Sequence, residues 1–184
     1  MTDWVSSRIS PAHELDRFDC GREPLNHWLR EFALRADSQA TARTIVWTRP
    51  DDPAVIAYYS VAPTELRRER LARSAHGGHS VIPGYLLARL AIDRGVQGRG
   101  LGTYLLLDAV ELVVAASTTG GGRLLVVDAI DDAAAAFYRA HGFTPITGTP
   151  PPLRTHQLTA GNAPLLTDLD QQSLVWRLVR CLPM

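Results

Sequence analysis

The sequence contains no lysine, so all 19 of its basic residues are arginines. An equal number of acidic residues brings the formal net charge to zero. This balance argues against a uniformly basic nucleic-acid-binding protein, although it leaves room for a local basic patch. The absence of lysine also excludes the phosphate loop of nucleotide hydrolases, which requires a Gly-Lys-Ser/Thr sequence.

Cysteine is also scarce, because only Cys20 and Cys181 are present and they stand far apart. They match no zinc-binding spacing, so we expect free thiols and no metal site. No apolar run approaches the roughly 20 residues that span a membrane, and the first ten residues lack the basic-then-apolar pattern of a signal peptide. With 184 residues, the chain is therefore expected to be a single cytoplasmic domain without membrane contact.

The most informative segment present is Tyr85–Gly102. Its apolar run from Leu86 to Ile92 predicts a buried strand. A glycine-rich turn follows, and then an apolar-periodic segment, Leu101–Ala116, that predicts a helix. Such a turn lets backbone N–H groups approach an anion at the positive end of the helix dipole. This arrangement predicts a site for a diphosphate.

Several kinds of site use glycine-rich turns. A dinucleotide-binding fold requires a GxGxxG spacing near the start of a βαβ unit, whereas this chain has GxGxG in its middle, after strand-rich sequence. A tight strand-to-helix connection without a ligand is the remaining structural alternative. Neither explains the order of the surrounding elements.

Local patterns predict an alternation of helices and strands along most of the chain. The expected strands are Val5–Ile9, Thr44–Thr48, Val55–Val61, Leu86–Ile92, Arg123–Ala129, Phe143–Ile146 and Ser173–Leu182. The expected helical segments are His13–Phe18, Glu23–Gln39, Glu65–Arg73, Leu101–Ala116 and a helix capped by Asp131 or Asp132 that ends at Ala140. Ala75–His79 is expected to be a mobile loop, and Arg154–Gln172 has no clear pattern.

The pattern Gln97-x-x-Gly100-x-Gly102, after a strand reading LARLAID, resembles the coenzyme A cradle of the GNAT superfamily of N-acetyltransferases. The segment Phe137–Phe143 similarly resembles the FYxxxGF element of that superfamily. The resemblance implies an α/β fold in which helices flank a mixed, mostly antiparallel central sheet. It further implies one acetyltransferase domain over residues 1–184, with an atypical C-terminal segment from about residue 148.

The N-terminal part narrows this resemblance to the toxin branch of the superfamily. Phe18-Asp19-Cys20-Gly21 and Leu25-Asn26-His27-Trp28-Leu29 are similar to its FDCG…LN.WL signature, and Arg43-Thr44 and Tyr58-Tyr59-Ser60 also match. Members acetylate the α-amino group of aminoacyl-tRNA, and their usual partner is a ribbon-helix-helix antitoxin. The resemblance therefore implies acetyl-CoA, aminoacyl-tRNA and an antitoxin as partners, and a possible homodimer. Phe18–Gly21 itself is expected to build the fold, with Phe18 packing, Asp19 capping and Gly21 turning.

The resemblance assigns roles to particular residues. Tyr138 is expected to protonate the departing thiolate. Acetyl-CoA is expected to bind along Leu90, Ala91, Ile92, Val96, Gln97, Gly98, Arg99, Gly100, Leu101 and Gly102. Arg30, Arg35 and Arg43 are candidates for binding the substrate, although Asp37–Thr41 dilutes the basic run that toxin members carry late in the second helix. Arg89 is a further candidate because of its place just before the cofactor-binding strand segment.

Two points stay open at this level. Arg89 either faces the substrate or pairs with an acid such as Glu111, because side chains alternate along a strand. The acceptor is either aminoacyl-tRNA or another amine, such as a small molecule or a peptide. A catalytically idle protein that binds coenzyme A as a regulator is the alternative outside enzymes.

Overall fold

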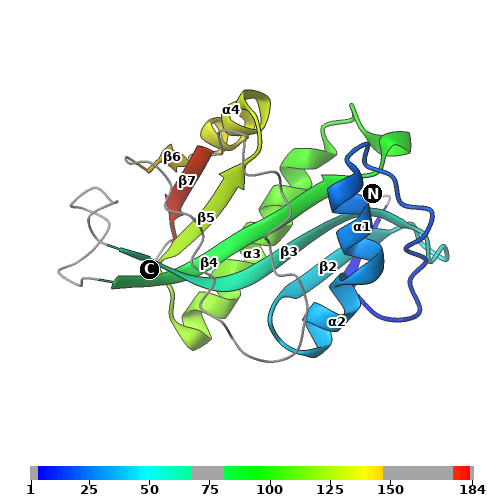
Figure 1. The fold of residues 1–184 in the computed structure, drawn as a ribbon, viewed down its shortest axis with the longest axis horizontal. Coiled ribbons are helices and arrows are strands. Elements are labelled where there is room, and N and C mark those ends of the chain that lie inside the picture. Colours follow the sequence, from blue (N-terminus) through cyan, green and yellow to red (C-terminus); the bar gives the residue numbers. More distant parts are fainter. Residues whose placement is uncertain (1–3, 68–80, 147–175, 183–184) are drawn as a thin grey trace. The chain divides into compact units, whose positions relative to one another are not determined.

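The structure is a computed structural model that describes residues 4–67, 81–146 and 176–182. In these ranges the strands are β1 (Val5–Arg8), β2 (Arg43–Thr48), β3 (Val55–Arg67), β4 (Val81–Ile92), β5 (Leu124–Ala129), β6 (Thr144–Pro145) and β7 (Trp176–Cys181). The helices are α1 (Glu23–Glu31), α2 (Ala33–Ser38), α3 (Leu101–Gly120) and α4 (Asp132–Ala140), with a 3₁₀ turn at Arg94–Val96 (Figure 1).

The strands follow the order β1-β2-β3-β4-β5-β7-β6. The pairs β1–β2, β2–β3, β5–β7 and β6–β7 are antiparallel. The predicted fold class, a mostly antiparallel sheet with flanking helices, is confirmed. The chain divides into two compact units: the first comprises Met1–Pro63 and Leu87–Ala115, and the second comprises Thr64–Leu86 and Ala116–Met184.

In the first unit, two neighbouring tyrosines of β3 show how helices cover both faces of the strands. The Tyr58 hydroxyl donates to the Leu25 carbonyl at 2.8 Å, on the side of α1. The Tyr59 hydroxyl donates to the Asp108 carboxylate of α3 at 3.2 Å. Because successive side chains of a strand point to opposite faces, α1 and α3 lie on opposite faces of β3, as Figure 1 also shows.

The core on the α1 side combines aromatic and aliphatic side chains. Trp28 stacks on Tyr58 with 6.1 Å between ring centroids, and the edge of Phe18 meets Tyr58 at 5.4 Å. Leu29 and Ala33 are fully buried in the same cluster. The predicted helix Glu23–Gln39 breaks at Phe32, where φ is −121° and ψ is −27°. The break divides it into α1 and α2, and both segments bury residues in this one core.

Helix α3 corrects one expectation, because its 20 residues are long and apolar enough to cross a membrane by length and composition. A buried core helix has the same properties. Leu105, Leu106 and Ala109 are fully buried in the folded chain. Asp108 lies mid-helix and accepts hydrogen bonds from Trp47 Nε1 and Ser6 Oγ, each at 2.6 Å. These contacts fasten one face of α3 to the fold, although only 22% of its apolar window is buried.

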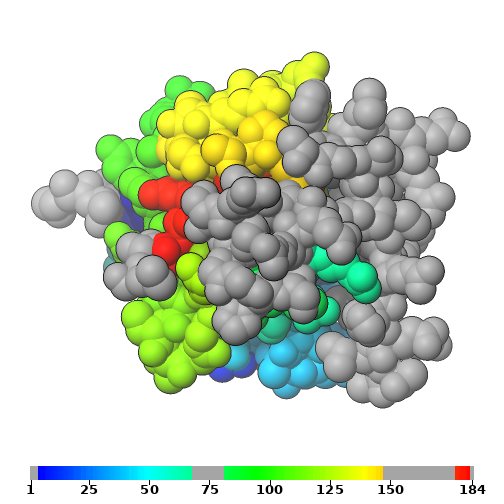
Figure 2. All heavy atoms as spheres, turned by 90° about the vertical axis from the view of Figure 1, so that its left-hand side faces the viewer, coloured from blue at the N-terminus to red at the C-terminus, as the bar shows by residue number. Residues whose placement is uncertain are grey.

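In the second unit, β7 lies between β5 and β6, and Figure 2 shows β7 in red beside the yellow of α4 and β6. Arg177 of β7 forms a two-bond ion pair with Asp128 of β5, with both N–O distances at 2.7 Å. Asp131 caps α4 by accepting from the Ala134 N–H at 2.8 Å. The predicted cap, helix and last strand are therefore present.

One predicted helical segment, His13–Phe18, is wrong, and so is the described beginning of another, Glu65–Arg67. His13–Phe18 forms turns, because the backbone of Glu14 pairs with residues beside β3: its N–H donates to the Pro53 carbonyl at 2.9 Å, and its carbonyl accepts from the Val55 N–H at 3.2 Å. Glu65–Arg67 continues β3. In both places pairing with distant residues overrides local propensity. The rest of the predicted 65–73 helix, the 75–79 loop and the 154–172 segment lie outside the described residues.

Candidate active site

The glycine-rich segment after β4 begins with a rigid turn that Asp93 organises. The Asp93 carboxylate accepts a hydrogen bond from the Gly95 N–H at 2.8 Å. The backbone carbonyl of Asp93 accepts from the N–H groups of Val96 and Gln97 at 3.0 and 3.1 Å. The Asp93 N–H donates to the Ile56 carbonyl of β3 at 2.8 Å. The amides of Val96 and Gln97, two of the residues along which we expect acetyl-CoA to bind, are thus used within the turn.

The next residues, Gly98–Gly102, are open, and we call them the cofactor loop. Gly98 and Gly100 have φ of +75° and +74°, with no atom within 4 Å of the position a Cβ would occupy. In the described part of the chain, the N–H groups of Gly98, Arg99 and Gly100 have no acceptor. The loop leads into the N-terminus of α3, where the Thr103 N–H donates to the Gly100 carbonyl at 3.3 Å and the amides of Leu101 and Gly102 precede the first helical hydrogen bonds. These residues fit the diphosphate of a coenzyme.

The Phe18–Gly21 segment is fastened to the turn below this loop. The Asp19 N–H donates to the Asp93 carboxylate at 2.9 Å, and the Asp19 carbonyl accepts from the Arg94 N–H at 2.9 Å. The Gln97 side chain donates to the carbonyls of Cys20 and Ile92 at 3.0 and 2.7 Å. Sequence reasoning assigned Phe18–Gly21 to the fold, and the structure shows which part it supports, namely the turn that precedes the cofactor loop.

Asn26 of α1 holds this segment from the other side. Its amide nitrogen donates to the Asp19 carboxylate at 2.8 Å, and its oxygen accepts from the Cys20 N–H at 2.9 Å. The hydrogen bond from the Gly21 N–H, followed by that from Asn26, lowers the pKa of Asp19. Burial raises the pKa of the Cys20 thiol, so this cysteine is a protonated, structural residue.

The strand segment Leu90–Ile92, expected to bind the pantetheine arm, leads directly into this turn. Ala91 is buried, whereas Leu90 and Ile92 are half-buried. The Ile92 carbonyl is occupied by the Gln97 side chain. The role of this segment in binding stays a prediction.

Tyr138 belongs to the second unit, where it is half-buried on α4. The edge of its ring packs against Phe137 and Phe143, with centroid distances of 5.3 and 5.4 Å. Burial, with a smaller contribution from the Asp128 carboxylate, raises the pKa of Tyr138 to about 12. The phenol is therefore protonated at neutral pH and can act as a proton donor. Its hydroxyl has no hydrogen-bond partner among the described residues.

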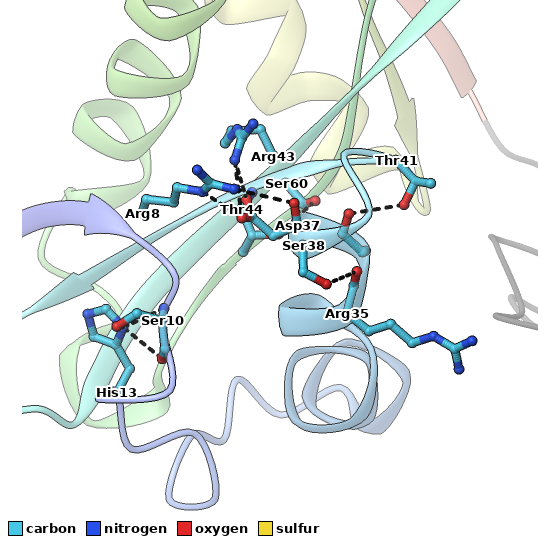
Figure 3. Close-up of polar contacts among 11 residues, drawn as sticks. Arg8, Ser10, His13, Arg35, Asp37, Ser38, Thr41, Arg43, Thr44 and Ser60 are labelled. Carbon is cyan, nitrogen blue, oxygen red and sulfur yellow. Dashed lines mark hydrogen bonds and ion pairs between the residues drawn. The ribbon is translucent and has the colours of Figure 1, made fainter. Parts of the chain in front are cut away.

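The arginines predicted to bind substrate have different environments. Arg43 and Arg8 both point toward the buried Asp37 (Figure 3), with N–O distances of 3.1 and 2.6 Å. The Thr44 N–H also donates to Asp37, at 3.1 Å. We call these four residues the Asp37 cluster. Arg35 points away from Asp37 (Figure 3).

An open groove of about 600 Å³ runs beside the Asp37 cluster and is lined by Arg8, Ser10, Leu34 and Arg35, among others. Arg30 lies outside this groove lining and pairs with Glu23 at 2.7 Å. The structure therefore brings Arg35 and Arg43 into one region with Arg8. Sequence reasoning missed Arg8, because its short, mostly exposed strand carries no motif.

Arg89 is different again, because it stacks on an aromatic ring. Its guanidinium carbon lies 4.1 Å from the centroid of the Trp28 ring. Burial lowers the pKa of Arg89 to about 10, so it still carries its charge at neutral pH. No ion pair joins Arg89 to Glu111 or to another acid in the described ranges. The described residues also contain no group of three or more His, Cys, Asp or Glu side chains that could hold a metal ion.

Residues 43–145 match the family model for the acetyltransferase (GNAT) domain. This chain belongs to the GNAT acetyltransferase family. The matched range contains the cofactor loop and Tyr138. The matched range also contains the strand–turn–helix junction with the open amides, where we predict that the coenzyme binds.

This GNAT chain is similar to tRNA-acetylating toxins over most of its length. A tRNA-acetylating toxin of Mycobacterium tuberculosis is 37% identical over 132 residues, which cover 71% of this chain and 78% of the toxin. The solved structure of AtaT complexed with acetyl-methionyl-tRNAfMet is 32% identical, has a TM-score of 0.75, and covers 79% of this chain and 89% of AtaT.

A second AtaT structure adds two further molecules. It contains a tyrosine-to-phenylalanine mutant of AtaT bound to the C-terminus of the antitoxin AtaR and to acetyl-CoA. It is 26% identical, has a TM-score of 0.72, and covers 98% of this chain and 94% of the AtaT chain.

Proposed function

We propose that this acetyltransferase transfers the acetyl group of acetyl-CoA to the α-amino group of aminoacyl-tRNA and thereby blocks translation as a toxin. The observation that carries the proposal is the cofactor loop, whose backbone N–H groups have no acceptor in the described part of the chain. The similarity to a tRNA-acetylating toxin, at 37% identity, supports the choice of substrate. A substrate of this kind places the protein in the cytoplasm.

The cofactor loop would hold the diphosphate of acetyl-CoA through the amides of Gly98, Arg99 and Gly100, and through those of Leu101 and Gly102 at the start of α3. The exposed Arg99 side chain would add a positive charge. The bound molecule supplies an activated acetyl thioester. Acetyl-CoA is also the ligand in the AtaT complex with the antitoxin.

The chemistry requires little from the protein beyond positioning and one proton. An α-amino group has a pKa near 8, so a useful fraction is neutral at pH 7 and no strong general base is needed. A backbone N–H of Leu90–Ile92 would stabilise the oxyanion. Tyr138 would donate its phenolic proton to the departing thiolate, since its raised pKa keeps that proton in place.

A toxin of this kind requires an inhibitor while the cell grows. The AtaT relative is bound to the C-terminus of its antitoxin AtaR. We therefore propose an antitoxin partner for this chain, of the ribbon-helix-helix class that the resemblance implies.

The direct test uses purified protein, radiolabelled acetyl-CoA and a set of charged tRNAs. Acetyl groups should appear on the aminoacyl end of one or more tRNAs. Tyr138→Phe should reduce the single-turnover rate about 100-fold or more and leave acetyl-CoA binding unchanged. Tyr85→Phe is the matched control, because the Tyr85 hydroxyl already donates to the Gly121 carbonyl at 2.8 Å.

Other outcomes separate the alternatives. Acetylation of small amines or peptides without any charged tRNA would favour a metabolic acetyltransferase. Binding of coenzyme A without turnover on any amine would favour a regulator. A rate for Tyr138→Phe equal to that of the wild type would remove the proposed role of this tyrosine.

A further inference from the structure

We propose that Arg89, supported by the Trp28 ring, binds a backbone phosphate at the aminoacyl end of the acceptor RNA. The inference rests on the proposed function and adds a specific contact to it. It assigns a ligand to a cation that has no acidic partner among the described residues.

Arg89 differs from six other arginines of the chain, which pair with carboxylates. Ion pairs join Arg8, Arg17, Arg30, Arg43, Arg94 and Arg177 to carboxylates at 2.6–3.4 Å. Arg89 is half-buried, yet in the described part of the chain its charge faces no carboxylate. A desolvated charge without a counter-ion is unfavourable, and an incoming anion would relieve this.

Within residues 4–67, 81–146 and 176–182, the groups around Arg89 carry no negative charge at physiological pH. Tyr58 interacts electrostatically with Arg89, but its hydroxyl donates to the Leu25 carbonyl. Burial raises the pKa of Tyr58 far above its usual value, so its phenol is neutral at physiological pH. The Trp28 ring offers only the negative face of its π-system.

The geometry of the stack favours phosphate as the anion. The guanidinium carbon lies over the Trp28 ring, 4.1 Å from its centroid, so the ring covers one side of the group. The N–H groups that do not face the ring can meet two oxygens of a phosphate, and Arg forms such bidentate contacts better than Lys. Trp28 is 6% exposed and thus fixed in the core, so it gives the guanidinium a fixed support.

The position of Arg89 in the sequence supplies the source of the phosphate. Arg89 immediately precedes Leu90–Ile92, where we place the reacting acetyl group, at about 3.3 Å of strand per residue. In aminoacyl-tRNA the amino acid is esterified to the last ribose, so the two nearest phosphodiesters are at the 5′ oxygens of the last and the second-last nucleotide. An acceptor aligned with its amine at this segment would bring one of them near Arg89.

The test combines a change in the protein with a change in the RNA. Two aminoacylated minihelices are compared, one native and one with uncharged methylphosphonates at the last two linkages. With the native RNA, Arg89→Gln should lower kcat/KM about 10- to 100-fold. With the uncharged linkages, wild type and Arg89→Gln should be equally slow. Independent, multiplicative losses would overturn the inference.

Controls separate this contact from other effects. Arg17→Gln removes a mostly exposed arginine that pairs with Glu14 and should change nothing. Arg89→Lys should recover only part of the activity, because it keeps the charge and loses the planar edge. Comparable protein stability is verified by thermal melting of each variant.

Calorimetry with acetyl-CoA distinguishes the second source of phosphate. An unchanged Kd in Arg89→Gln supports the acceptor as the ligand, whereas a weakened Kd with unchanged dependence on the RNA linkages assigns Arg89 to the coenzyme and overturns the inference. If the wild type acetylates no aminoacylated RNA, the proposed function itself fails. If it does and Arg89→Gln matches it, only this inference fails.

Discussion

The Asp37 cluster and the cofactor loop lie in the same unit but use their polar groups in opposite ways. The Asp37 carboxylate, whose side chain is 5% exposed, accepts from Arg8, Arg43 and the Thr44 amide. The amides of Gly98, Arg99 and Gly100 find no acceptor in the described part of the chain. The Asp37 cluster therefore satisfies its polar groups internally, whereas the cofactor loop leaves backbone N–H groups that a ligand could bind.

This difference separates residues that stabilise the fold from residues that carry function. A basic residue with an internal acid contributes to stability and offers less of its charge to a partner. The same holds for Arg30 on Glu23, in contrast to Arg89 on Trp28. Substitutions should therefore divide into two classes, one that changes binding and one that changes unfolding.

The largest effect is expected at the open loop. Gly100→Asp places a carboxylate where we propose that the diphosphate binds, at a φ of +74° that L-residues rarely adopt. Acetyl-CoA affinity should fall at least about 100-fold by calorimetry, through charge repulsion and lost amide contacts. Gly121→Asp is the control, because Gly121 has the same open space and a φ of +77° at the other end of α3. Equal affinity in both variants would contradict the comparison.

The Asp37 cluster should respond in the opposite way. Asp37→Ala removes the acceptor of three donors and leaves the buried Thr44 amide without a partner. It should lower the free energy of unfolding by about 3 kcal/mol, which corresponds to a melting temperature about 6–12 °C lower for a chain of this size. Acetyl-CoA affinity, measured below the transition, should stay unchanged. A loss of affinity without a loss of stability would reverse our assignment.

Asn26 should give a mixed effect, since it connects the fold to the turn below the cofactor loop. Asn26→Ala removes its bonds to Asp19 and the Cys20 amide. We expect about 2 kcal/mol of lost stability and an increase of a few-fold in the Kd for acetyl-CoA, measured by chemical denaturation and calorimetry. Asn26→Asp keeps the acceptor for Cys20 and places a second carboxylate beside Asp19, so it should be no better than alanine. Wild-type affinity in both would show that the turn is rigid without this support.

The smallest effect is expected in the pH dependence of Asp19→Asn. The folded state lowers the pKa of Asp19, so the charged form adds stability above the unfolded-state pKa of about 4, and this contribution is lost as the pH falls through the folded-state value. The variant should melt slightly below wild type at pH 7, and the gap should close in acid. A gap that widens toward acid would contradict the sign of this shift.

The sequence predicted the central elements because their signals are local. The apolar run of β4, the glycines after it and the apolar-periodic α3 lie within one continuous stretch. The predictions were wrong where contacts with distant residues determine the local structure, as at Glu14, whose backbone pairs with Pro53 and Val55. In the candidate site, the glycine-rich loop could be predicted from the sequence, but the partner of each arginine side chain could not. The partner of Arg43 lies six residues earlier on α2, and that of Arg89 is a ring on α1.

Tyr58 and Tyr59, consecutive residues of β3, fix the position of this strand relative to the helices on its two faces. One reaches a backbone carbonyl of α1 and the other a carboxylate of α3, so a shift of β3 by a single position would direct each phenol to the wrong layer. Gain or loss of one codon between the turn at residue 52 and these tyrosines is thus far less tolerable than an ordinary point change. Length variation among homologues should accumulate elsewhere.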